Sequence, residues 1–182
     1  MARRTQLVVG VAVGLALWAP APVLSEVLLT ERKALERAFP GAVVEKRTLY
    51  LTEVQVAAIE KTARSRMPSA IVTVYEARTG GALVGRAVLD THVVRTMPAT
   101  VLSAVATDGT LKMALVLQFT EPPDYLPREG WLKTLAGRVL DDDLWPGRGV
   151  NAVTGATLTV HAFTDAIRRA LAVDALVLRS DP

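Results

Sequence analysis

The stretch ATVLSAVATDGTLKMALVLQFT, residues 99–120, indicates the architecture most directly, because it reads as two strands joined by a tight turn. Residues 99–107 and 111–120 are mostly apolar and contain several β-branched side chains. Asp108-Gly109 between them is a strong signal for a hairpin turn. We therefore expect an antiparallel hairpin here.

A second hairpin is predicted just before it. Residues 70–76 are rich in β-branched residues, Thr79-Gly80-Gly81 forms a turn, and residues 82–89 return as a strand. Hairpins that follow one another along the chain place their strands side by side in an antiparallel sheet. We therefore predict an α+β domain, with a mainly antiparallel sheet and flanking helices.

Helix signals lie on both sides of these hairpins. Thr30 is expected to cap a short helix that ends at Pro40-Gly41, and residues 43–51 read as extended. Thr52 and Gln55 have capping-box spacing, so a helix is expected from there to about residue 65. A short helix is plausible at 131–135, and apolar residues at helical spacing predict a C-terminal helix after residue 157.

Composition limits the possible functions. The chain has 182 residues, 51% of them hydrophobic, and a net charge of +3. Arg3 and Arg4 lie in the first 25 residues, which contain no acid, so the remaining body has a charge of +1 and no nucleic-acid partner is expected. The absence of cysteine excludes disulfides and cysteine-ligated clusters. His92 and His161 are far apart in sequence, so no metal site is expected.

The first 25 residues resemble an export segment. Arg3 and Arg4 precede an apolar run over 7–17, and small residues follow, as in a signal peptide. Cleavage after Ser25 is expected, with an uncleaved membrane anchor over 7–24 as the alternative. Either way, we expect the body to be periplasmic or anchored facing the periplasm. The predicted organisation is an export segment or anchor at 1–25, a helical and extended segment at 26–69, and a ligand-binding domain at 70–182.

The stretch with the clearest chemical meaning is residues 151–159, Asn-Ala-Val-Thr-Gly-Ala-Thr-Leu-Thr. It opens the predicted C-terminal helix, whose first turn presents free N–H groups and the positive end of the helix dipole to a phosphate. Gly155 and Ala156 add little bulk there, and Thr157 places a hydroxyl at the same point. The alternative is that these residues form only a turn and an N-cap.

Thr154-Gly155-Ala156-Thr157 resembles the end of the flavinylation motif of the FMN-binding domain family. That family includes FMN subunits of the Na+-translocating NADH:quinone oxidoreductase and of the Rnf complexes. Residues 84–88, 108–111, 121–125 and 131–132 also resemble the family, so the likeness spans roughly 74–173. Asn151 departs from the pattern, because the family usually has aspartate there.

The resemblance implies FMN as the cofactor, covalently bound through its phosphate to Thr157 at the N-terminus of the C-terminal helix. Thr154, Gly155, Ala156 and Leu158 would lie beside the phosphate. Near the ring, the candidates are Glu121, Tyr125, Trp131 and Leu132, for each of which ordinary packing is the alternative.

The resemblance also implies partners. A separate flavin transferase would attach the FMN, using FAD and Mg2+, and membrane or periplasmic redox proteins would exchange electrons with it. The chain would then be an electron-transfer flavoprotein or redox-complex subunit, not a stand-alone catalyst, and no catalytic residue is assigned. The alternative functions are a flavin-free module and a sensory or regulatory module of the same fold.

Two other groups of polar residues are not expected to form sites. Asp90, His92 and Ser103 contain the residue types of a catalytic triad, but no nucleophile-elbow context surrounds them. The acidic run at 141–143 is interpreted as a solvated loop.

Overall fold

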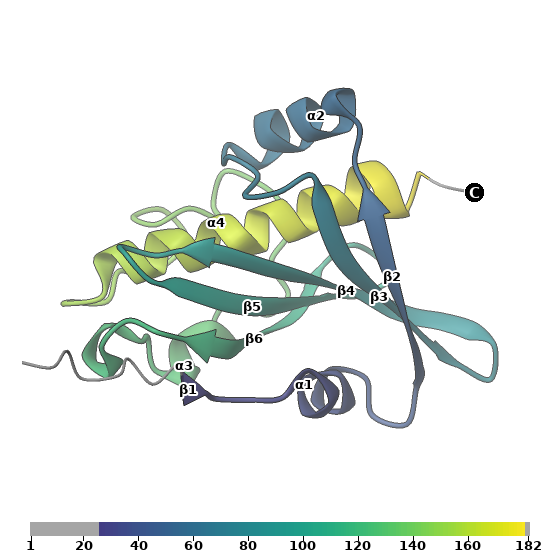
Figure 1. The fold of residues 1–182 in the computed structure, drawn as a ribbon, viewed down its shortest axis with the longest axis horizontal. Helices are drawn as coiled ribbons and strands as arrows, with labels where there is room; N and C mark the ends of the chain where they lie inside the picture. The colour runs from purple at the N-terminus through teal and green to yellow at the C-terminus, as the bar shows by residue number, and fades with distance from the viewer. Residues whose placement is uncertain (1–25, 181–182) are drawn as a thin grey trace, which may run out of the picture.

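The computed structural model describes residues 26–180, which form a six-stranded sheet with helices on both faces (Figure 1). The strands are β1 (Glu26–Val27), β2 (Val43–Tyr50), β3 (Ile71–Thr79), β4 (Ala82–Val93), β5 (Pro98–Val105) and β6 (Leu111–Phe119). The helices are α1 (Glu31–Ala38), α2 (Glu53–Ala63), α3 (Glu129–Lys133) and α4 (Thr157–Val173), with a 3-10 turn η1 (Pro123–Tyr125) and a π-helical end η2 (Asp174–Leu178).

Every pair of neighbouring strands in this sheet is antiparallel, in the order β1-β6-β5-β4-β3-β2. The predicted α+β class with a mainly antiparallel sheet is therefore confirmed. Both edge strands come from residues 26–69, since β2 pairs with β3 and β1 pairs with the end of β6. Glu26 lies opposite Phe119, so the first described residue adjoins the last residue of β6.

Two helical layers cover the sheet (Figure 1). α4 lies across β4 and β5 with α2 beside it, and α1 lies on the other face. Between the sheet and α4, buried side chains such as Val101, Phe163 and Ile167 form the largest core cluster. This packing fixes the N-terminus of α4 at the same end of the molecule as the β4–β5 connection and α3 (Figure 1).

Several local signals have the predicted effect. Thr30 caps α1, and Thr52 and Gln55 form the predicted capping box of α2, with N–H···O distances of 2.9 and 3.3 Å. α2 ends at Ala63, two residues earlier than predicted, because Arg64 adopts a left-handed conformation with φ of 53°.

β4 is longer than predicted. Sequence alone suggests an end near residue 89, whereas the strand continues to Val93. Asp90 and His92 are buried within this extension, where Arg169 of α4 pairs with Asp90. Residues 1–25, the predicted signal peptide or anchor, lie outside the described residues. Within residues 26–180, no helix combines the length and apolar character needed to cross a bilayer.

Candidate functional site

The N-terminus of α4 is an open helix end. α4 is 17 residues long, its N-cap is Ala156, and no side chain caps it. Its first turn also contains no acidic residue. The leading N–H groups of a helix lack partners within the helix and carry the positive end of its dipole. The alternative interpretation, in which these residues form only a turn and an N-cap, would need a capping side chain, and none is present. An anion could accept hydrogen bonds from the free N–H groups at the start of α4.

The backbone before α4 leaves room at this end. Gly155 has φ of 83°, a conformation that side chains rarely adopt, and no atom lies within 4 Å of where its Cβ would be. The Ala156 N–H donates to the Val153 carbonyl at 3.0 Å and closes the turn. Together these features leave open space directly in front of the first turn of the helix.

Thr157 and Thr159, the two threonines in the first turn of α4, differ in exposure. Thr157 is exposed at the first position of α4, as is Leu158 beside it, and Thr154 is exposed in the preceding turn. The Thr159 side chain, by contrast, is 1% exposed, and its hydroxyl lies in the interior. Of these two α4 hydroxyls, only that of Thr157 can be reached by another enzyme.

Trp131 holds the loop that leads into α4. Its indole Nε1–H donates to the Asn151 carbonyl at 2.8 Å, and its ring is buried in the core cluster beneath α4. Leu132 is buried in the same cluster. Trp131 therefore positions the 151–156 loop from below. Both side chains lie in the core beside the site and do not line the cavity described next.

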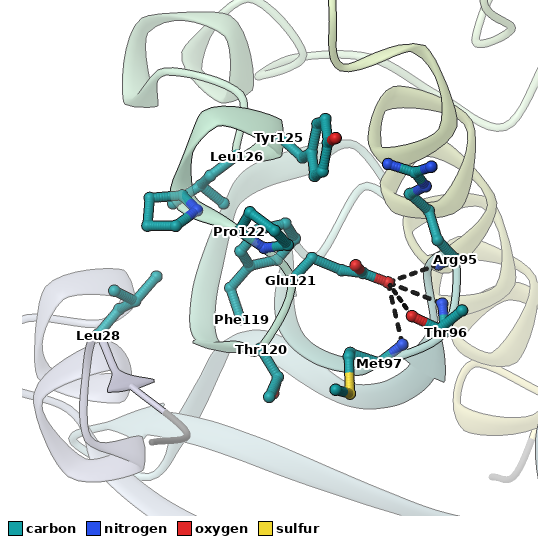
Figure 2. A pocket seen from close by; sticks show the side chains of 11 residues that line it. Leu28, Arg95, Thr96, Met97, Phe119, Thr120, Glu121, Pro122, Tyr125 and Leu126 are labelled. Atoms are coloured by element: carbon teal, nitrogen blue, oxygen red, sulfur yellow. Dashed lines mark hydrogen bonds between the residues drawn. The ribbon is translucent and has the colours of Figure 1, made fainter. Parts of the chain in front are cut away.

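A cavity of about 600 Å³ lies at this end of the molecule (Figure 2). Its volume is within the range of small-molecule and cofactor sites. Glu121 and Tyr125, two of the predicted ring contacts, line it. The other lining residues are Leu28, Arg95, Thr96, Met97, Phe119, Thr120, Pro122, Pro123 and Leu126.

The cavity and the helix end are linked through two aromatic rings. Phe119 lines the cavity and contacts Phe163 of α4 edge-to-face, with centroids 6.1 Å apart. Phe163 follows Thr157 by six residues, a rise of ~9 Å along the helix. The contact therefore connects the lining of the cavity to the buried face of α4.

The Glu121 carboxylate organises the β4–β5 connection (Figure 2). Its Oε1 accepts three backbone N–H groups, those of Arg95 at 3.1 Å, Thr96 at 2.7 Å and Met97 at 3.0 Å. The hydrogen bonds from the Thr96 and Met97 amides lower the pKa of Glu121, so it is ionised at neutral pH. Glu121 thus fixes one wall of the cavity.

Arg95 is a cavity residue that the sequence analysis missed. Its guanidinium carbon lies 4.6 Å from the centroid of the Tyr125 ring, a cation–π distance. Nothing in the sequence marks Arg95, because its position depends on Glu121, 26 residues away. An exposed arginine in a loop between strands carries no motif.

The two other groups of polar residues considered in the sequence, the Asp90, His92 and Ser103 set and the acidic loop at 141–143, do not form functional sites in the structure. The Asp90 carboxylate accepts a hydrogen bond from His92 at 2.7 Å and two from Arg169 at 2.8 Å. The Ser103 hydroxyl is buried without a hydrogen-bond partner, so no nucleophile and base are in contact. In the acidic loop, Asp142 pairs with Arg64 at 2.8 Å. No group of three or more potential metal-ligating side chains occurs within residues 26–180.

The fold and site therefore define a class, an α+β domain with an uncapped helix N-terminus and a cavity of cofactor size. Residues 97–172 match the family model described as the FMN-binding domain, which supports an FMN-binding domain in this part of the chain. The matched region contains β5, β6, η1, α3 and most of α4. This match supports an FMN-binding protein. A search of curated proteins gave no match.

Proposed function

We propose that this chain is an exported electron-transfer protein that carries FMN as a phosphoester on Thr157. The observation that carries the proposal is an exposed threonine on an uncapped helix N-terminus, in a molecule that also has a cavity of about 600 Å³. The family match supports FMN as the cofactor. The covalent link, the export and the electron transfer are the proposed steps.

Attachment requires a second enzyme, a flavin transferase that uses FAD and Mg2+. The Thr157 oxygen would bond to the phosphorus on the FMN side of the FAD diphosphate. The bond between the two phosphates would break, AMP would leave, and the hydroxyl proton would pass to a base of the transferase. The exposure of Thr157 fits this role because the hydroxyl must enter the active site of another protein.

This chain would hold the cofactor at two places. The free N–H groups at the start of α4 would bind the phosphate, with Thr154, Gly155 and Ala156 forming the turn beside it. The cavity lined by Glu121 and Tyr125 would hold the ring. FMN supplies one- and two-electron redox chemistry when bound, and the protein orients it and sets its reduction potential.

The predicted export segment at residues 1–25 supports a location in the periplasm or on the membrane facing it. A covalent tether suits that compartment, because a dissociated cofactor would be lost. We propose membrane or periplasmic redox proteins as the electron donor and acceptor, a partner class inferred from the family resemblance.

One observation favours a second candidate, a flavin-free binding or regulatory module. Asn151 stands where the family usually has aspartate, and its side chain is exposed. The loop is held through the Asn151 backbone carbonyl. The loop therefore does not need an asparagine side chain at position 151.

The test is co-expression of the full chain with a flavin transferase. After denaturing electrophoresis, the wild type should show flavin fluorescence and a mass increase of one FMN less one water. Thr157→Ala should abolish both signals, and Thr157→Ser should retain them. Thr159→Ala is the matched control and should retain them, because that hydroxyl is buried. A wild type without fluorescence would exclude covalent attachment and favour the flavin-free module.

A further inference from the structure

Arg95 is a cation in the lining of the cavity that forms no salt bridge among the described residues. It lies in the β4–β5 connection with an exposed side chain, and the cavity includes it in its lining. Within residues 26–180, its guanidinium forms no salt bridge; it contacts the face of Tyr125 at 4.6 Å and interacts with the Glu121 carboxylate at longer range. Figure 2 shows the two side chains side by side at the cavity.

The cavity contains one other charged residue, Glu121, but this carboxylate is already satisfied. One of its oxygens accepts three backbone N–H groups and a weaker hydrogen bond from the Thr96 hydroxyl at 3.4 Å. The remaining lining residues are uncharged. A bound anionic group would therefore meet one available cation in this cavity, the Arg95 guanidinium.

The backbone fixes where this cation lies. The Arg95 N–H is itself one of the donors to Glu121, so the turn that carries the side chain is tied to the end of β6. Tyr125 then supplies a flat surface that orients the guanidinium, since cations stack on aromatic faces. The cation is thus held in place before any ligand binds.

We infer that Arg95 raises the reduction potential of the flavin by stabilising its reduced, anionic form. This inference rests on the proposed function, which places the ring in the cavity. Two electrons and one proton convert the oxidised ring into a reduced form with one negative charge. A cation beside the ring favours that form over the neutral oxidised one, which is a recognised way for proteins to tune flavins.

The experiment measures the reduction potential of the flavin-loaded full chain by reductive titration against reference dyes. Two unit charges ~4 Å apart in water change an equilibrium constant roughly fivefold. Arg95→Gln should therefore lower the ratio of reduced to oxidised flavin about fivefold at a fixed potential, which is ~20 mV for a two-electron couple. The difference should shrink at high salt, because Arg95 is exposed.

Two further variants separate charge at the ring from other effects. Arg95→Lys keeps the charge and should keep most of the potential. Arg66→Gln removes the same charge from the exposed α2–β3 connection and should leave the potential unchanged. Together they distinguish a local cation from a change in net charge.

The possible outcomes are distinct. Absence of flavin from the wild type itself would refute the proposed function. Full loading with a wild-type potential in Arg95→Gln would overturn this inference alone. So would poor loading with an unchanged potential in the loaded fraction, because Arg95 would then act in attachment. Equal shifts in Arg95→Gln and Arg66→Gln would overturn it as well.

Discussion

Asp90→Asn tests whether a buried ion pair holds α4 against the sheet. Arg169 of α4 donates two hydrogen bonds of 2.8 Å to the Asp90 carboxylate of β4. The two residues are 5–6% exposed, so solvent screens the pair weakly. The substitution keeps the size of the side chain and removes its charge, so the buried guanidinium loses the carboxylate to which it is hydrogen-bonded.

The size of the effect follows from the pKa of Asp90. Burial opposes its ionisation, but hydrogen bonds from His92 and Arg169 outweigh this and lower the pKa from 3.8 to about 2. At ~1.4 kcal/mol per pKa unit, the native contacts of the carboxylate contribute roughly 2–3 kcal/mol at neutral pH. Removing one partner of a buried pair costs ~3–5 kcal/mol, so we expect a loss in that range.

The sign of the pH dependence is fixed by this lowered pKa. The contribution of Asp90 is fully present above the unfolded value of 3.8 and is lost as the pH falls through about 2. The difference in stability between wild type and Asp90→Asn should therefore be constant near neutral pH and narrow between about 4 and 2.

Thermal and urea unfolding followed by circular dichroism would measure the effect. For a chain of this size, each kcal/mol shifts Tm by ~2–4 °C, so the variant should melt at least ~6 °C lower. Asp142→Asn is the matched control, because that aspartate also pairs with arginine but its side chain is 62% exposed, and a loss of at most ~1 kcal/mol is expected. Equal losses in both variants would refute the reasoning.

Three further substitutions test the site itself. Trp131→Phe removes the hydrogen bond to the Asn151 carbonyl, so urea unfolding should show a stability ~1 kcal/mol lower than that of the wild type. Less flavin should also be attached in a fixed co-expression time. Unchanged stability and attachment would show that other contacts hold the loop. Gly155→Ala meets no neighbouring atom but must adopt φ of 83°, so calorimetry should show a loss of ~1 kcal/mol, and an unchanged Tm would contradict the backbone argument. Asn151→Asp restores the usual family residue and should speed flavin attachment in a time course, whereas an equal or slower rate would show that this position does not limit attachment.

Local chemistry explains which parts of the fold could be predicted. The Asp108-Gly109 turn, the Thr52 capping box and the Thr30 cap each depend on residues a few positions apart, and each forms as expected. The end of β4 could not be predicted in this way. Asp90 reads as a strand terminator until Arg169, 79 residues later, pairs with it in the core.

The same distinction between local and long-range determinants applies to the candidate site. The helix end at Thr157 could be predicted because its motif is contiguous, and the structure adds that the nearby Thr159 hydroxyl is buried. The cavity could not, because its walls come from Leu28 after β1, the β4–β5 connection, the end of β6 and the segment that follows it. Glu121 was expected near the ring from family likeness, but its hydrogen bonds to the 95–97 backbone depend on tertiary structure.

The open N-terminus of α4 also has a consequence for maturation. A capping side chain at this position contributes ~1 kcal/mol to the stability of a typical helix, and Ala156 cannot provide one. A phosphate on Thr157 would supply the missing acceptor, so attachment would stabilise the helix end as well as deliver a cofactor. The immature chain would then be the form most easily cut by proteases near residues 151–156, and cofactor loading would select which molecules persist in the compartment.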